Sequence, residues 1–146
     1  MTLLATSLLL WLGAAATETV PTVIQAPDSP VRVDHAKVLN VVPNEPAVLM
    51  YAATNVTDDD LEQFTVIVFV FDAAGTLKAK QIAPARRTLE KRTTKYSTMV
   101  LDGWPVTATD RVVFGVNQAQ RTESDKWWSA ELGGLAADAV KTPRQP

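Results

Sequence analysis

The amino-acid sequence predicts an all-β fold: an immunoglobulin-like antiparallel β-sandwich of about seven strands, with a short C-terminal helix. From residue 31 to residue 128, runs rich in β-branched and aromatic residues alternate with clusters of Pro, Gly, Asn and Asp. The same region has no long apolar stripe of helical period. The chain also lacks cysteine, so core packing and strand pairing have to hold such a domain together.

The first 16 residues are interpreted as a signal peptide that precedes the fold. Leu3–Ala16 is an apolar block, and it is shorter than the about 20 residues that a membrane-spanning helix needs. It ends in three alanines, which fit the small residues of a signal-peptidase site and leave Thr17 as the mature N-terminus. Because no Lys or Arg precedes the block, retention as a weak N-terminal anchor is the alternative. We expect export to the periplasm or the extracellular space.

Residues 17–30 are predicted to form an extended linker, since they contain three prolines and show no regular period. The sandwich domain is assigned to residues 31–128 and a C-terminal tail to residues 129–146. In the tail, apolar residues recur at helical spacing, which predicts the short helix. These residues are Leu132, Leu135, Ala136, Ala139 and Val140.

Six runs of residues are typical of β-strands. They span residues 31–42, 47–56, 64–71, 76–82, 93–101 and 111–118. A proline-containing cluster at residues 43–46 and a charged loop at residues 57–60 separate the first three runs. Gly75 supplies the positive φ that closes a hairpin after the third run. Pro84 is expected to end the fourth run, because proline has no N–H to donate to a ladder.

The strand at residues 64–71 is apolar on both faces, unlike a strand with one solvated side. Ile67, Phe69 and Phe71 occupy its outer face, and exposing them would forgo about 5 kcal/mol of burial free energy. Two kinds of cover are open. Either the C-terminal tail or the pair Trp127-Trp128 covers the face from within, or a partner chain or second copy covers it from outside.

The stretch Ala47–Leu77 resembles the FxLYD-type domains, small bacterial immunoglobulin-like sandwiches found in exported proteins. Asn55 corresponds to the asparagine that closes the second strand of that family, and a polar loop follows it. The named motif falls on Val68–Asp72, where Asp72 matches by identity and two other positions match by type. The resemblance implies the same sandwich and an accessory or binding role, and it transfers no catalytic residue.

A non-enzymatic protein without cofactor or metal is predicted. The single histidine, His35, follows Asp34 in a predicted strand, and no serine lies in a glycine-flanked elbow. Three aspartates at residues 58–60, with Glu62, are weighed as calcium ligands, but the run does not alternate and has no glycine. A solvated loop is the favoured interpretation. The net charge of -2 argues against a nucleic-acid partner.

Half of the chain's 14 lysines and arginines lie between residues 78 and 95. Only Glu90 opposes them there, whereas residues 45–72 carry acids and no base. The sequence therefore predicts an electrically asymmetric domain, whose basic segment is weighed as a contact for an anionic envelope surface or for the acidic face of a second copy. An edge strand and loop kept soluble by these charges is the favoured interpretation. The basic residues are Lys78, Lys80, Arg86, Arg87, Lys91, Arg92 and Lys95.

Two further motifs favour ordinary structural roles. Residues 55–57 (Asn-Val-Thr) fit the N-glycosylation pattern, which we expect to be unused because the family resemblance is bacterial. Trp104-Pro105 and Trp127-Trp128 are weighed as a sugar-stacking platform, and packing in or around the core is favoured.

The sequence as a whole favours a non-enzymatic exported module that binds or scaffolds. The alternative is a subunit or accessory domain of a cell-envelope complex, and a weaker alternative is a small ligand-binding protein or enzyme. A protein partner, self-association or contact with an anionic envelope surface is expected. The candidate interaction surface comprises Ile67, Phe69, Phe71, Lys78, Lys80, Arg86, Arg87, Lys91 and Arg92.

Overall fold

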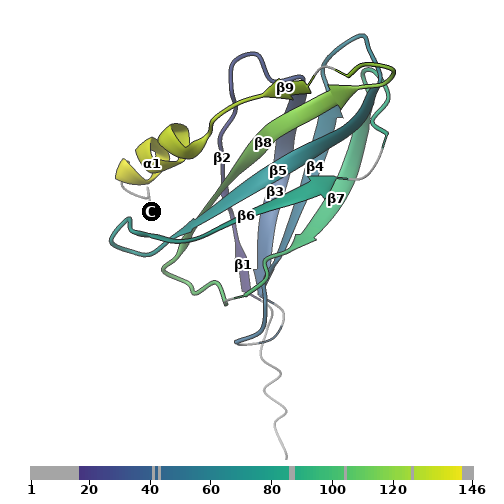
Figure 1. The fold of residues 1–146 in the computed structure, drawn as a ribbon. Coiled ribbons are helices and arrows are strands. Elements are labelled where there is room, and N and C mark those ends of the chain that lie inside the picture. Colours follow the sequence, from purple (N-terminus) through teal and green to yellow (C-terminus); the bar gives the residue numbers. More distant parts are fainter. Residues whose placement is uncertain are drawn as a thin grey trace, which may run out of the picture.

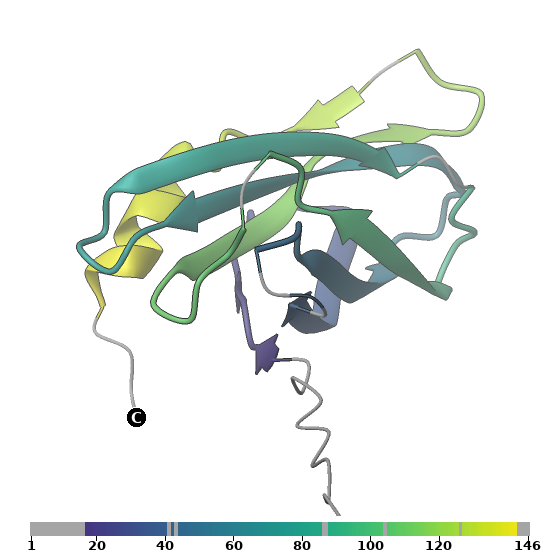
Figure 2. The same ribbon diagram turned by 90° about the horizontal axis from the view of Figure 1, so that it is seen from below.

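The computed structural model describes residues 17–40, 42, 44–85, 88–103, 105–125 and 127–142. Over these residues the chain forms two β-sheets packed face to face, with one short helix on the outer side of the second sheet (Figure 1). Figure 2 shows the same two layers from below. The all-β sandwich with a short C-terminal helix that the sequence predicts is confirmed.

The first sheet, here called the β4 sheet, has four antiparallel strands in the order β1-β3-β4-β7. They are β1 (Thr17–Thr19), β3 (Val31–Asn40), β4 (Val48–Asn55) and β7 (Thr94–Val100). A β-bulge shifts the register of β3 against β4 between Asp34 and Lys37. At the far side of this sheet β7 is the edge strand.

The second sheet, here called the β5 sheet, has the order β2-β8-β5-β6, and β9 also pairs with β8. Its strands are β2 (Thr22–Val23), β5 (Leu61–Phe71), β6 (Leu77–Ala85), β8 (Arg111–Arg121) and β9 (Trp127–Ser129). Only the short β2 runs parallel to its neighbour among the described pairs. With β3-β4-β7 facing β6-β5-β8-β9, the longer strands follow the order of an immunoglobulin-like sandwich.

The fourth predicted run differs from the structure at its end, because β6 continues through Pro84 to Ala85. Pro84 lies opposite Thr65 of β5. β6 is the edge of the β5 sheet, and an edge strand tolerates proline because one of its sides has no ladder partner. The missing N–H therefore did not stop the strand.

Residues 17–30, expected from the sequence to be an extended linker ahead of the first strand, contain two short strands that join the sheets. β1 pairs with β3, and β2 pairs with β8. The N–H of Ile24 donates to the carbonyl of Phe114 at 2.9 Å, and both Ile24 and Ala26 are buried. The proline count indicated extended backbone correctly. It could not reveal that burial of these apolar side chains draws the extended segment onto the sandwich.

The main core lies between the two sheets. Leu49 and Tyr51 of β4 face Val66 and Val68 of β5 together with Phe114 of β8, and all of these side chains are buried. The rings of Tyr51 and Phe114 are 5.6 Å apart between centroids and tilted by 51°, a favourable aromatic arrangement. This core joins the two sheets across the middle of the domain.

The outer face of β5 is covered from within the chain. Ile67, Phe69 and Phe71 are only 7%, 4% and 5% exposed. They form a second buried cluster with Leu132 and Ala136, at the start and first turn of the helix α1 (Gly133–Lys141), and with residues beside β2. Their assignment to an interaction surface is therefore corrected, since the tail already removes these side chains from solvent.

α1 is fixed to the sheet at its C-terminal end. Arg111 donates from Nη1 to the carbonyls of Val140 at 2.8 Å and Thr142 at 2.9 Å, and from Nη2 to that of Ala139 at 3.0 Å. A guanidinium at this end satisfies the last carbonyls and complements the helix dipole. The helix has nine residues, and no helix in the described ranges is long and apolar enough to cross a membrane.

Gly115 in β8 makes the close packing of this outer layer possible. A Cβ atom added there would lie 2.3 Å from the carbonyl oxygen of Ile24 and 3.0 Å from a methyl carbon of Leu132. Both the β2 segment and the start of α1 therefore approach the sheet over a residue without a side chain.

Asn55 joins the end of β4 to two loops. Its Nδ2 donates to the carbonyls of Asp59 at 2.8 Å and Leu89 at 3.0 Å, while Oδ1 accepts from the N–H and hydroxyl of Thr57. The side chain is fully buried. Because both amide hydrogens are engaged, the folded protein offers no accessible glycosylation acceptor at this asparagine.

Candidate functional site

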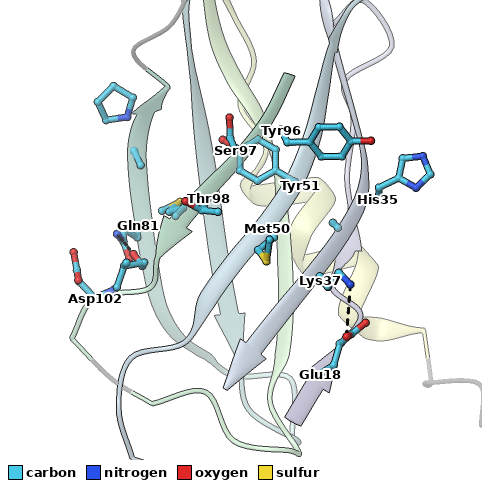
Figure 3. Close-up of a pocket in the computed structure, with 15 residues that line it drawn as sticks. Glu18, His35, Lys37, Met50, Tyr51, Gln81, Tyr96, Ser97, Thr98 and Asp102 are labelled. Atoms are coloured by element: carbon cyan, nitrogen blue, oxygen red, sulfur yellow. Dashed lines mark hydrogen bonds and ion pairs between the residues drawn. The ribbon is translucent and has the colours of Figure 1, made fainter. Parts of the chain in front are cut away.

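A groove of about 980 Å³ lies beside β7, where each sheet ends in an edge strand. Residues from β1, β3, β4, β6 and β7 line it, together with Asp102 in the loop after β7 (Figure 3). β6 closes one sheet and β7 the other, so no strand of the described chain spans the gap between the two layers here. This groove is a concave surface that lies away from the covered outer face of the β5 sheet.

Alternation of side chains along β4 and β7 gives the groove two kinds of wall. On the core-facing side, Tyr51 lies opposite Ser97, and the buried Met99 follows two residues later. On the outer side of the β4 sheet, Met50 lies opposite Thr98 and is half-buried. Both walls therefore combine apolar surface with hydroxyl groups, a composition suited to binding.

Two exposed apolar side chains stand on the outer side of β7. Tyr96 is 73% exposed and Val100 is 50% exposed. The outer faces of the two sheets thus differ. α1 and the β2 segment cover Ile67, Phe69 and Phe71 on β5 and leave Ile82 of β6 53% exposed, whereas the β4 sheet presents Tyr96 and Val100 to solvent.

The hydrogen-bonding direction of β7 follows from the bonds at its two ends. The N–H of Asn55 donates to the carbonyl of Thr93 at 3.0 Å, and the N–H of Leu101 donates to that of Ala47 at 2.9 Å. Backbone groups alternate in direction along an antiparallel strand. The backbone N–H and C=O groups of the odd-numbered residues of β7 therefore point toward β4. Those of the even-numbered residues 94, 96, 98 and 100 point toward the open edge.

Gln81 of β6 occupies one end of that edge. Its Nε2 donates to the carbonyl of Val100 at 3.0 Å, and its Oε1 accepts from the N–H of Asp102 at 3.0 Å. One side-chain amide thereby links the two edge strands across the groove (Figure 3). The open backbone edge of β7 is limited to residues 94–98.

The ionisable groups of the groove differ in environment. Burial raises the pKa of the Tyr51 phenol, and a hydrogen bond with Ser97 opposes that rise. Lys37 lies 3.7 Å from Glu18 in an exposed ion pair. His35 lies in the β-bulge of β3 with a backbone φ angle of 48°, and its side chain is 76% exposed. In the described part of the chain, no group of three or more His, Cys, Asp or Glu side chains is placed to hold a metal.

The predicted basic surface is divided by internal contacts. Lys78 Nζ is 2.7 Å from Oδ2 of the buried Asp110, and Arg92 Nε is 2.9 Å from Oδ1 of Asp58. Lys95 donates to the carbonyl of Thr88. Lys80, on β6, lies opposite Phe69, and Lys91 is exposed. Arg86 and Arg87 lie outside the described residues.

In the ion pair of Asp110 with Lys78, both burial and hydrogen bonds act on the pKa of the carboxyl group. Burial disfavours its charged form, but hydrogen bonds from Lys78 and from Thr107 outweigh that effect, and the net pKa of Asp110 is lowered. The backbone N–H of Thr107 donates to the same carboxylate at 2.9 Å. The ion pair therefore holds β6 against the loop that precedes β8.

The aspartates at residues 58–60 do not converge on one point. Asp58 contacts Arg92, Asp59 lies 3.4 Å from Arg121, and Asp60 accepts from the N–H of Lys91 at 2.8 Å. The prediction of electrical asymmetry is therefore corrected here, because these acidic residues contact basic residues. The acidic loop lies against the basic segment, because strand pairing brings the two ends of the β5–β6 hairpin region together.

The tryptophan pair does not form a single flat platform. Trp127 and Trp128 are neighbours in β9, so their side chains point to opposite sides. Trp127 is 44% exposed, whereas Trp128 packs against both buried clusters, with its Nε1 buried and without a hydrogen-bond partner. Trp104 lies outside the described residues.

Comparison with protein-family models, curated proteins and solved structures finds no match for this chain. The fold and the groove are therefore interpreted from their own geometry.

Sequence reasoning did not single out the groove residues Met50, Gln81 and Tyr96. Nothing in the order of strands along the chain shows that β6 and β7 become the two open edges. The available signal was the polar and hydroxyl-rich composition of β7, which carries Tyr96 between two threonines on one face. That pattern indicates a solvated face with one large exposed ring.

Proposed function

We propose that this chain is a non-enzymatic exported binding module that docks a protein partner along the β7 groove. The observation that carries the proposal is the contrast between the covered outer side of β5 and the exposed outer side of the edge strand β7. Cover from within the chain buries Phe69 and its neighbours on one face, whereas Tyr96 and Val100 remain exposed on the other. Aromatic and aliphatic side chains beside an open strand edge suit a protein partner, because backbone and side chains bind together there.

Export is supported by the N-terminal sequence. The apolar block Leu3–Ala16 lies outside the described residues, and cleavage after its last alanine would leave Thr17 and all of β1 in the mature chain. The FxLYD-type resemblance of Ala47–Leu77 supports an accessory role. N-terminal sequencing of protein recovered from outside the cytoplasm tests export: a start at Thr17 supports cleavage, and an intact Met1 favours a retained anchor.

The binding proposal is tested by photocrosslinking in the native host. A benzophenone amino acid replaces Thr98 at the groove in one full-length variant and Ile82 in another. Ile82 is an equally suitable reference site, since it is 53% exposed on β6 and does not line the groove. We expect one reproducible protein adduct from the Thr98 probe and none from the Ile82 probe.

A second change shows whether the groove itself is responsible. Met50→Glu places a charge in the outer wall of the groove and should abolish the adduct formed from Thr98. Equal capture from both probe positions, or no adduct at Thr98, would overturn the proposal. Because a groove of about 980 Å³ is also in the size range of small-molecule sites, native mass spectrometry of the purified chain accompanies the experiment. A stoichiometric small ligand displaced by the same substitution would favour a ligand-binding protein instead.

A further inference from the structure

We propose that the open edge of β7 pairs with β7 of a second copy of this chain, about a two-fold axis at Tyr96. This pairing would join two four-stranded β4 sheets into one continuous sheet across the dimer. The inference rests on the proposed function in placing a protein partner at the groove, and it names that partner's chemistry: an identical strand.

Among the edge strands of the described sandwich, β7 is a long one, and it carries little protection against pairing with a strand of another chain. The opposite edge strand, β6, contains Pro84 and two lysines, Lys78 and Lys80, which are common devices against edge-to-edge association. The remaining edges are formed by β1, β2 and β9, which have two or three residues each. β7 has seven residues and no proline, and the ammonium group of its single lysine, Lys95, is bound to Thr88.

The open part of the edge is symmetric about Tyr96. Backbone N–H and C=O groups of Thr94, Tyr96 and Thr98 face away from β4, and Gln81 occupies the edge from Val100 onward. A second β7 laid antiparallel with Tyr96 opposite Tyr96 would pair all three of these residues. Three such hydrogen-bonded pairs supply about six backbone hydrogen bonds.

The side chains along this edge follow the same order in either strand direction. On the outer face the order is Thr94, Tyr96, Thr98, so the two-fold arrangement places Tyr opposite Tyr and Thr opposite Thr twice. Aromatic pairs and threonine pairs are favourable cross-strand neighbours. On the core-facing side, Lys95 lies opposite Ser97 of the other copy, and no like charges are opposed. An unrelated peptide would use the backbone groups but would have no reason to match this palindrome.

A single cysteine tests both the contact and its register, because the natural chain has none. In a hydrogen-bonded antiparallel pair the two Cα atoms are about 5.5 Å apart, within the range that a disulfide spans. Full-length Tyr96→Cys should therefore form a disulfide-linked dimer under mild oxidation. Thr98→Cys is the matched control: it lies on the same face, and its two copies would be about 13 Å apart along the paired strands.

We expect Tyr96→Cys to crosslink at least about tenfold faster than Thr98→Cys at equal concentration. Sedimentation velocity of the unmodified full-length chain should show a monomer–dimer equilibrium with a dissociation constant of about 10⁻⁵ to 10⁻⁴ M, as suits a small interface. Tyr96→Lys places two ammonium groups on the axis and should weaken that equilibrium at least about tenfold, whereas Ile82→Lys should not. Unchanged circular dichroism of both lysine variants separates loss of pairing from unfolding.

Each result of these experiments supports or overturns the β7 dimer. Equal or faster crosslinking of Thr98→Cys, or a chain that stays monomeric at about 500 μM, would overturn the dimer. If the Thr98 probe then still captures another protein in cells, the proposed function stands with a different partner. If the dimer forms and the probe captures only this same chain, the groove is an interface between copies.

Discussion

The guanidinium of Arg111, on β8, donates a hydrogen bond of 2.8 Å to the carbonyl oxygen of Val140 near the end of α1. α1 has no side-chain N-cap hydrogen bond and begins with two glycines, so little of its stability comes from the helix itself. Since α1 covers Phe69 and its neighbours, this one arginine on β8 helps to keep that apolar cluster buried.

Arg111→Met should loosen α1 while keeping the aliphatic part of the side chain. We expect the free energy of unfolding to fall by about 1.5–3 kcal/mol, because hydrogen bonds to three carbonyls are lost from a charged donor. Hydrogen exchange should accelerate over residues 133–141. Arg121→Met is the control, since its 3.4 Å contact with Asp59 is exposed and should contribute less than about 1 kcal/mol. Unchanged protection of α1 in the Arg111 variant would contradict the anchoring role.

Gly115→Ala should destabilise the protein, because the new methyl group would lie 2.3 Å from the carbonyl oxygen of Ile24. Overpacking of this kind costs about 1–3 kcal/mol, measurable by chemical denaturation. Gly134→Ala should act in the opposite direction and stabilise by up to about 1 kcal/mol, since nothing lies within 4 Å of a Cβ atom at that helical position. The same sign for both substitutions would refute the argument.

Asn55→Ala should lower the free energy of unfolding by about 2–3 kcal/mol, because the carbonyls of Asp59 and Leu89 lose their donor. The loops at both positions should also exchange hydrogen faster. Gln63→Ala provides a comparison, since its side-chain bond of 2.8 Å to Gln120 is only partly buried and water replaces it. A loss at Asn55 no greater than that at Gln63 would show that the network contributes little.

Asp110 should contribute to the acid sensitivity of the fold. Its pKa is lowered in the folded state from the ordinary value of 3.8, so folding favours the ionised carboxylate. The associated stability is complete above pH 3.8 and is lost as the pH falls through the lower, folded-state pKa.

The variant Asp110→Asn tests this directly through denaturation curves between about pH 2 and pH 7. At neutral pH it should lose about 2–3 kcal/mol, less than a fully buried pair because Lys78 is 33% exposed. On the acid side its stability should decline less steeply than that of the natural chain. Asp58→Asn, at an exposed pair with Arg92, should show a smaller effect. If the free energy of unfolding of the natural chain and of the Asp110 variant declined equally steeply at acid pH, the prediction would be wrong.

Much of the local structure could be read from the sequence. Each of the six predicted runs corresponds to a strand, and the apolar stripe at residues 132–140 corresponds to α1. Local patterning succeeds here because alternation and helical spacing reflect which faces are buried. β1, β2 and β9 were not predicted, since strands of two or three residues carry too little pattern.

The site was predicted less well. The apolar outer face of Phe69 was recognised correctly as needing cover, but its use as an interaction surface was wrong, since α1 packs on it. The basic residues were recognised by charge, whereas their partners Asp58 and Asp110 are far away along the chain and meet them only through strand pairing.

The sequence by itself determined the strands, the helical tail and the presence of one strand with two apolar faces, because these depend on neighbours two to four residues away. Only the tertiary structure decided that the tail covers that strand, that Gln81 reaches across to Val100, and that β7 is left as an open edge. Such pairings join residues distant in the chain, and their free energy depends on what the whole fold buries rather than on local pattern.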